Sequence, residues 1–163
     1  MPGAGYLVVS PNPRGSTSYG DAFTAGCLGD WGGGDWRDIL AALDKALELS
    51  YADSSRTGIY GYSYDSMASW AIGQTDRFKA AVIGGPMTHV HKAVTPSLIL
   101  HPEEDQRCPI GQSEQHFIGL LEANVPTEFI RYPGQSHLML WSGPVAYRID
   151  LYTRVLAWFE RYL

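Results

Sequence analysis

Short apolar runs rich in β-branched residues alternate with longer segments of helical periodicity along this 163-residue chain. Such alternation is typical of βαβ units, in which helices connect parallel strands. The predicted strands are 5–10, 57–62, 80–84, 97–100 and 127–132. The predicted helices are 36–49, 65–73, 110–123 and 145–163, and Asp35 is expected to cap the first of them. The fold class is therefore α/β, with a mainly parallel sheet of about five strands flanked by helices.

The length fits a single domain over residues 1–163. A formal net charge of −5 argues against a nucleic-acid surface, which needs clustered Lys and Arg. The apolar runs are far shorter than the ~20 residues of a membrane helix, and the first residues lack a signal-peptide pattern. We therefore expect a cytoplasmic protein that acts on a small molecule, with no nucleic acid and no membrane involved. Cys27 and Cys108 lack the spacing of a disulfide framework, and both are expected to be reduced, buried thiols.

The residues Gly61-Tyr-Ser-Tyr-Asp65 lie where a predicted strand meets a predicted helix. A serine on such a sharp turn has strained backbone angles and exposes its hydroxyl above the sheet. The adjoining helix N-terminus favours the negative charge that develops during acyl transfer. Ser63 is thus the candidate nucleophile, and the backbone N–H of Tyr64 is the candidate oxyanion-hole donor. An ordinary turn serine fits so short a motif equally well, so the assignment depends on partners downstream.

Two polar loops downstream supply partners in the order serine, acid, histidine that this turn predicts. The first loop contains Glu103, Glu104 and Asp105, and Asp105 is selected because the other two lie closer to the strand end. His137 follows the last predicted strand on a turn. His137 would accept the serine proton while Asp105 orients the imidazole. A merely solvated acidic loop is the alternative for the first of these segments.

The remaining histidines are assigned no chemistry. His89 and His91 alternate as metal ligands on a strand could, but no acidic or cysteine partner stands at ligand spacing, so no metal and no cofactor is expected. His101 is predicted to pack within a loop. His116 is predicted to lie on the surface of a helix.

Several blocks follow one another in order along nearly the whole chain. They are 11–16 with 19–20, Asp30-Trp-Gly-Gly33 with Asp35 and Asp38, Gly61-Tyr-Ser-Tyr64, 70–80, Glu103-Glu-Asp-Gln-Arg-Cys-Pro109 and Gly134-Gln-Ser-His137. Together they resemble the catalytic domain of the prolyl oligopeptidase family, especially its acylaminoacyl-peptidase branch. The resemblance implies an α/β-hydrolase fold and the same three catalytic positions, Ser63, Asp105 and His137.

The chain departs from the pattern of that family in three places. At the elbow, Asp65-Ser-Met67 stands where the family has Gly-Gly-Tyr-Met, so one residue is missing. A long helical segment before the acid loop is reduced to residues 86–94, so we expect a minimal domain without most of the lid. The chain begins at what corresponds to the fourth strand of the family, so the earlier strands and the loop with the second oxyanion donor are also expected to be absent.

The third strand of the family sheet would lie between residues 5–10 and residues 57–62. Its absence leaves two strand edges with unpaired backbone groups, and such edges recruit partner chains. We therefore expect a homo-oligomer, most simply a dimer. Direct pairing of the two strands within one chain is the alternative.

The expected activity is that of a serine hydrolase working through an acyl-enzyme. An open site without a lid or propeller suits a carboxylesterase for small, short-chain acyl esters better than it suits a gated peptidase. Two alternatives stay open. One is the peptidase activity of the family on acylated or short peptides, and the other is a catalytically weak, truncated relic that serves as an interaction module.

Overall fold

The computed structural model describes residues 1–63, 67–85 and 92–163. The chain divides into two compact units, Met1–Ser54 and Ser55–Leu163. All strands that the structure describes belong to the second unit.

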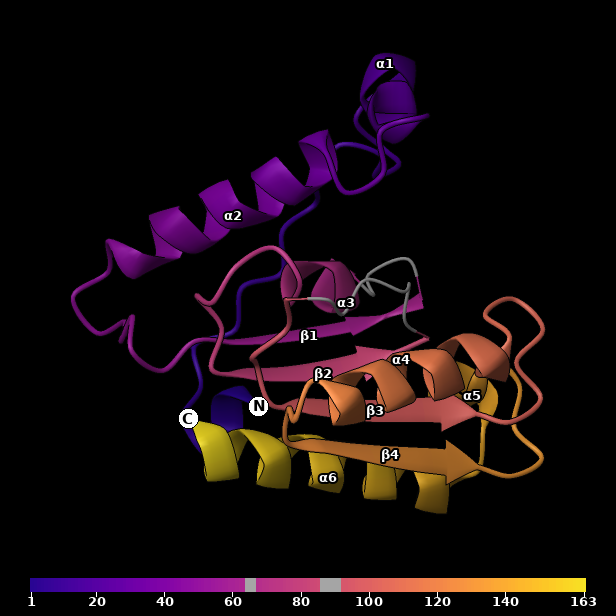
Figure 1. Cartoon of the computed structure of the whole chain (residues 1–163). Coiled ribbons are helices and arrows are strands. Elements are labelled where there is room, and N and C mark those ends of the chain that lie inside the picture. The colour runs from indigo at the N-terminus through magenta and orange to yellow at the C-terminus, as the bar shows by residue number, and fades with distance from the viewer. Residues whose placement is uncertain (64–66, 86–91) are drawn as a thin grey trace. The chain divides into compact units, whose positions relative to one another are not determined.

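The second unit is built on a sheet of four parallel strands (Figure 1). They are β1 (Gly58–Tyr62), β2 (Ala80–Gly84), β3 (Ser97–Pro102) and β4 (Thr127–Tyr132), and they pair in chain order. In this register Gly61 lies opposite Ile83, and Ile83 lies opposite Ile99. The predicted α/β class with a parallel sheet is confirmed. Because all four strands run the same way, their carboxyl ends meet at one edge, where α/β proteins place their sites.

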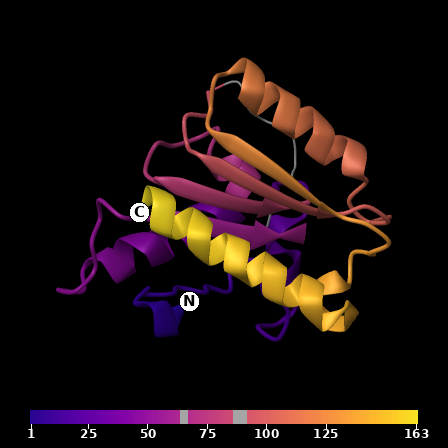
Figure 2. The ribbon, with the colours of Figure 1, turned by 90° about the horizontal axis from the view of Figure 1, so that it is seen from below.

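Helices cover both faces of this sheet. The short helix α3 (Met67–Ala71) packs on β1 and β2, and α4 (Ile110–Glu122) packs on β3 and β4. The long helix α6 (Val145–Tyr162), which follows the single turn α5 (Met139–Ser142), contacts β2 and β3 from the opposite face (Figures 1 and 2). The result is a three-layer arrangement typical of doubly wound α/β folds.

The two central strands form the core. Every residue of β2 and of β3 is buried, as expected for parallel strands covered on both faces. Ile83 and Ile99 are fully buried beside Leu120 of α4, and each such side chain contributes about 1.5–3 kcal/mol through apolar burial. On the other face, Phe159 of α6 packs so closely on β1 that a Cβ at Gly58 would stand 2.6 Å from its ring.

The predicted buried strand at residues 5–10 is wrong. Residues 6–13 have no regular secondary structure, and Leu7, Val8 and Val9 are between 43% and 48% exposed. A short apolar run predicts a strand only where neighbouring strands pair with it, and the described residues provide no such pairing here. The sheet therefore has four described strands in place of about five.

The first unit is organised around one helix, α2 (Gly34–Leu47), which confirms the helix predicted at 36–49. Asp35 does not cap it, because the helix begins one residue earlier and Gly33 holds the cap position. A carboxylate oxygen of Asp30 instead accepts the backbone N–H of Gly34 (2.9 Å). The preceding glycine-rich segment holds the short helical turns α1 (Asp21–Thr24) and η2 (Ala25–Cys27).

An ion pair ties the glycine-rich segment of this unit to α2. The guanidinium of Arg14 donates to both carboxylate oxygens of Asp38, at 2.8 and 2.7 Å, and the Arg14 backbone N–H donates to the same group. These bonds lower the pKa of Asp38 to about 2. A depression lined by Asn12, Tyr19 and Phe23 adjoins the pair.

Within the described residues, no helix combines the length and the apolar character that crossing a bilayer requires.

Candidate active site

Ser63 lies directly after β1 at the carboxyl edge of the sheet. Its φ of 63° is left-handed, a conformation that costs a non-glycine residue of order 1–3 kcal/mol and is retained where the surrounding structure enforces it. The helix α3 begins only four residues later, at Met67. A strained serine between a parallel strand and a helix is the geometry that the sequence motif predicted.

Asp105 lies on the loop that follows β3, and its carboxylate is held in a fixed orientation. One oxygen, Oδ1, accepts the backbone N–H groups of Arg107 and Cys108, both at 2.9 Å. The second oxygen, Oδ2, takes no part in these two bonds. The neighbouring carboxylates are used differently, since Glu103 pairs with Arg131 at 2.8 Å and Glu104 is exposed.

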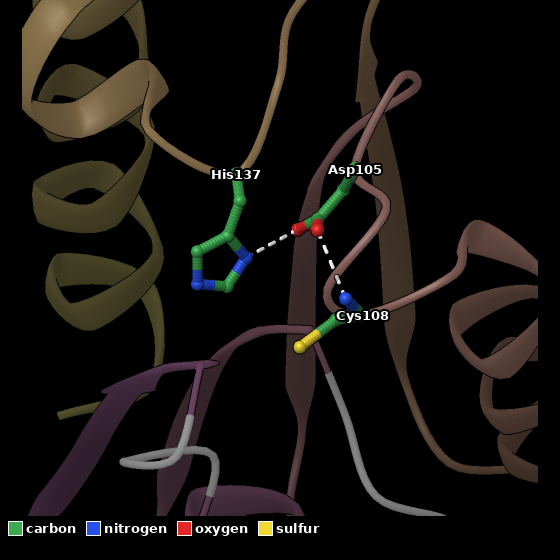
Figure 3. A group of neighbouring side chains, drawn as sticks. All are labelled: Asp105, Cys108 and His137. Atoms are coloured by element: carbon green, nitrogen blue, oxygen red, sulfur yellow. Dashed lines mark hydrogen bonds and ion pairs between the residues drawn. The ribbon is translucent and has the colours of Figure 1, made fainter.

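His137 follows β4 and faces that free oxygen. Its Nδ1 lies 2.7 Å from Oδ2 of Asp105, and the two side chains are only 7% and 1% exposed (Figure 3). The carboxylate accepts a hydrogen bond from Nδ1–H, which leaves Nε2 as the ring nitrogen with a free lone pair. Tyr62, the last residue of β1, donates its hydroxyl to the backbone carbonyl of His137 (3.0 Å) and packs its ring against the imidazole. Tyr62 of β1 and Asp105 on the loop after β3 therefore fix this histidine from two sides.

Cys108 connects the serine to the acid–histidine pair. Its side chain forms a hydrogen bond with Ser63. Its sulfur, a ring nitrogen of His137 and an oxygen of Asp105 all lie within 4.8 Å of one another (Figure 3). Burial and the nearby charge of Asp105 raise the pKa of the thiol, while the bond to Ser63 lowers it. The three residues selected from the sequence thus gather around one half-buried thiol. The only sequence signal for this thiol was that Cys108 follows Asp105 by three residues.

Gly85 lies against both Cys108 and the backbone of Ser63. Gly85, at the end of β2, has a φ of 71°, and a Cβ there would stand 3.1 Å from Cβ of Cys108 and 3.9 Å from the backbone nitrogen of Ser63. Glycine is required because the backbone must approach the thiol closely in a left-handed conformation.

His101 binds the backbone of the loop that contains Asp105. The prediction that His101 itself lies within a loop is wrong. It belongs to β3 and is fully buried. Its Nε2 lies 2.9 Å from the backbone carbonyl of Cys108, and its Nδ1 lies 2.6 Å from the hydroxyl of Ser113. Because a carbonyl only accepts, Nε2 carries the proton and Nδ1 accepts from the serine. Burial lowers the pKa of His101, which favours this neutral, fully bonded ring.

His116 was predicted on the surface of a helix, and this too is wrong. It lies on the inner face of α4, is fully buried, and neither ring nitrogen has a hydrogen-bond partner in the described part of the chain. Burial lowers the pKa of His116 to about 4. The helical stripe of Ser113, His116 and Leu120 at spacings of three and four marks the buried face, which an assignment by residue type alone overlooked.

Three other predicted positions lie outside the described residues. Tyr64, the candidate oxyanion donor, falls in 64–66, and His89 and His91 fall in 86–91. The two thiols are both free: Cys27 is buried as predicted, and Cys108 is half-buried.

The chain matches the model of the prolyl oligopeptidase family over residues 1–91 and again over 84–163. The uncharacterized peptidase YuxL of Bacillus subtilis is 35% identical over 199 aligned positions, which cover 98% of this chain and 30% of that protein. The dipeptidyl-peptidase 5 of Porphyromonas gingivalis is 30% identical, covering 83% of this chain and 26% of that one. Because the first alignment is longer than this chain, that relative contains internal segments absent here.

Solved structures agree with the sequence matches. The acylaminoacyl peptidase of Pyrococcus horikoshii superposes with a TM-score of 0.89 and 26% identity, over 93% of this chain and 31% of that one. The chain thus spans under a third of the length of these relatives. Because the family model matches residues 1–91 and 84–163 and the predicted fold is confirmed, this chain belongs to the prolyl oligopeptidase family.

Proposed function

We propose that this chain is a serine hydrolase in which Ser63 is the nucleophile, His137 the general base and Asp105 the residue that orients it. The observation that carries the proposal is the 2.7 Å bond between buried Asp105 and His137, from loops that end neighbouring strands, beside a strained serine at the end of a third. Nucleophile, base and orienting acid are the minimal set for acyl transfer through a covalent intermediate.

The reaction would proceed in two halves. Ser63 Oγ attacks the substrate carbonyl carbon while Nε2 of His137 accepts the hydroxyl proton. The imidazolium, stabilised by Asp105, then returns that proton to the leaving group, and the acyl group stays on Ser63. Water attacks the acyl-enzyme with His137 again as base, which releases the acid and restores the serine. The backbone N–H of Tyr64 is our candidate for stabilising the oxyanion in both halves.

We propose a peptide bond as the scissile bond. Two of the three relatives are named as peptidases acting on dipeptidyl or acylaminoacyl groups, and the third is named as a peptidase. This favours the peptidase alternative over the short-chain carboxylesterase expected from the open site. The two activities share one intermediate, and an activated ester has a better leaving group than an amide. Ester hydrolysis is therefore a convenient readout and does not identify the physiological substrate.

Labelling with a fluorophosphonate tests the nucleophile without assuming a substrate. We expect the wild-type chain to be labelled and the Ser63→Ala variant to be unlabelled, with Ser69→Ala, a change at a buried serine of α3, as the matched control. Loss of the nucleophile should lower hydrolysis of an aryl ester by roughly 10⁴–10⁶-fold. If the wild-type chain is not labelled, it is the inactive relic and the proposal fails.

A panel of chromogenic anilides then identifies the substrate class. N-acetylaminoacyl, dipeptidyl and free aminoacyl anilides should be compared with a short-chain aryl ester, each with Ser63→Ala as the blank. Turnover of an acylated or dipeptidyl anilide supports the peptidase assignment. Turnover of the ester alone, with every anilide inert, would return the assignment to a carboxylesterase.

A further inference from the structure

The group around Cys108 has a property that acyl transfer does not use. Thiolate, imidazole and carboxylate are the three side-chain ligand types that bind Zn²⁺ and related cations. Here one of each lies within 4.8 Å of the other two, at an edge of the sheet where Cys108 is only half-buried (Figure 3). In the proposed reaction Asp105 and His137 have roles, whereas the Cys108 sulfur has none.

We propose that Cys108, His137 and Asp105 form a binding site for a thiophilic divalent cation such as Zn²⁺ or Cd²⁺, and that the bound cation blocks the catalytic group. The part of this proposal that concerns blocking depends on the proposed function. The part that concerns binding does not.

The distances suit a first-row or soft cation after small side-chain adjustments. With Zn–S near 2.3 Å and Zn–N near 2.0 Å, the sulfur and nitrogen of a tetrahedral site stand about 3.5 Å apart. The sulfur and nitrogen here are separated by no more than 4.8 Å. Binding replaces the thiol proton, which passes to solvent, so that Cys108 coordinates as the thiolate.

The surroundings favour binding of the cation at Cys108, His137 and Asp105 over binding at His101. The 2.7 Å contact between Asp105 Oδ2 and His137 Nδ1 already brings these two ligands together before any cation binds. Both ring nitrogens of His101 are already hydrogen-bonded, so His101 is not a competing ligand. Among the described residues three protein side chains converge, and a fourth coordination position can be taken by water or by the hydroxyl of Ser63. A site of this kind binds reversibly and does not require the closed four-ligand shell of a structural zinc.

The bound cation would disable the base whichever ring nitrogen it takes. At Nε2 it occupies the lone pair that accepts the serine proton. At Nδ1 it displaces to solvent the proton that is hydrogen-bonded to Asp105, and the orientation of the imidazole by that bond is lost. It also neutralises the negative charge that stabilises the imidazolium. Inhibition is therefore expected to be complete at saturation.

Binding is measured by titrating the full chain with CdCl₂ and following the ultraviolet charge-transfer absorption of a cadmium–thiolate bond. The chain has two cysteines, so Cys27→Ala is the matched control for Cys108→Ala. We expect the band in the wild type and in Cys27→Ala and its loss in Cys108→Ala. His137→Ala keeps the thiol and should weaken Cd²⁺ binding by at least about tenfold through loss of the imidazole ligand. A band that persists in Cys108→Ala, or an affinity unchanged in His137→Ala, overturns the proposal.

Blocking is measured on the same proteins by fluorophosphonate labelling in the presence of ZnCl₂. Wild type and Cys27→Ala should lose labelling as Zn²⁺ rises, and chelation should restore it. Cys108→Ala also removes the hydrogen bond to Ser63, so its own labelling rate without Zn²⁺ is the reference for that variant. Relative to that rate, it should need at least about tenfold more Zn²⁺ for the same fractional loss. Equal sensitivity of the two cysteine variants contradicts the blocking role. A chain that binds Cd²⁺ through Cys108 but is never labelled fails the proposed function and not the binding site.

Discussion

The carboxyl edge of the sheet buries two histidines and the inner face of α4 buries one, and their hydrogen bonding differs. At the edge, His137 and His101 are bonded to Asp105, Ser113 and the carbonyl of Cys108. On α4, His116 is just as deeply buried and has no hydrogen-bond partner among the described residues. A buried polar group that is bonded is held in one orientation and can act, whereas an unbonded one only costs free energy. We therefore expect the bonded histidines at the edge to affect activity and His116 to affect stability.

The largest effect should come from breaking the bond at the edge. Asp105→Asn keeps the shape of the side chain and presents an amide, so His137 is held in the wrong tautomer, and turnover should fall by roughly 10⁴-fold. Steady-state hydrolysis of an activated ester measures this. The exposed neighbour Glu104 provides the control, since Glu104→Gln removes a carboxylate from the same loop and should leave the rate unchanged. Equal losses in both variants would mean that the loop, and not the bond, matters.

The next effect concerns stability on α4 and depends on pH. An unfolded histidine takes up a proton near its ordinary pKa of about 6.5, whereas burial keeps folded His116 neutral down to about 4. The unfolded state therefore binds more protons between these values, and stability falls as the pH drops through this window. At pH 5 the loss from this residue should be about 2 kcal/mol.

His116→Leu should remove that loss and also the desolvated ring nitrogens, so the variant should be more stable than wild type, and most clearly at pH 5. Urea unfolding at pH 7.5 and pH 5 measures the difference, and the parallel contribution of His101 cancels because both proteins retain it. Gln115→Leu, on the exposed side of the same helix, is the matched control and should show no pH-dependent gain. A variant with the same pH dependence as wild type would show that His116 has the same pKa in the folded and unfolded states.

The contrast also explains which parts of the molecule the sequence could predict. The run at 80–84 was predicted at its observed bounds because burial on both faces leaves a continuous apolar pattern. The run at 127–132 was predicted at its observed bounds because a partly buried edge strand alternates apolar and polar residues. Asp105 and His137 could be found because strand order brings their loops together. Residues 5–10 have a similar apolar pattern but no described pairing partner, and pairing is not encoded in a single run. The burial of His116 and the place of Cys108 depend on helix packing and loop geometry, which residue type does not reveal.

A smaller effect is expected at Tyr62, which holds the backbone of His137. Tyr62→Phe removes the 3.0 Å hydrogen bond but keeps the ring against the imidazole, so stability should fall by about 0.5–1.5 kcal/mol and turnover by up to roughly tenfold. Tyr132→Phe removes a 3.0 Å hydroxyl bond to Asp150 and is the matched control. It should lose similar stability with no change in rate. If the two variants lose rate equally, Tyr62 is a structural residue and does not position the base.

The last prediction concerns the oligomeric state, which changes the mass in solution by a factor of two. The same distinction between bonded and unbonded polar groups applies to the backbone of the sheet, because β2 and β3 have neighbours on both sides, whereas β1 pairs only with β2 among the described strands. An open edge presents N–H and C=O groups that another strand can pair with, and this supports the predicted dimer.

Light scattering across a wide concentration range should give twice the 18.0 kDa of one chain. A wild-type mass of one chain at every concentration would mean that the edge is covered within the chain or left open to water.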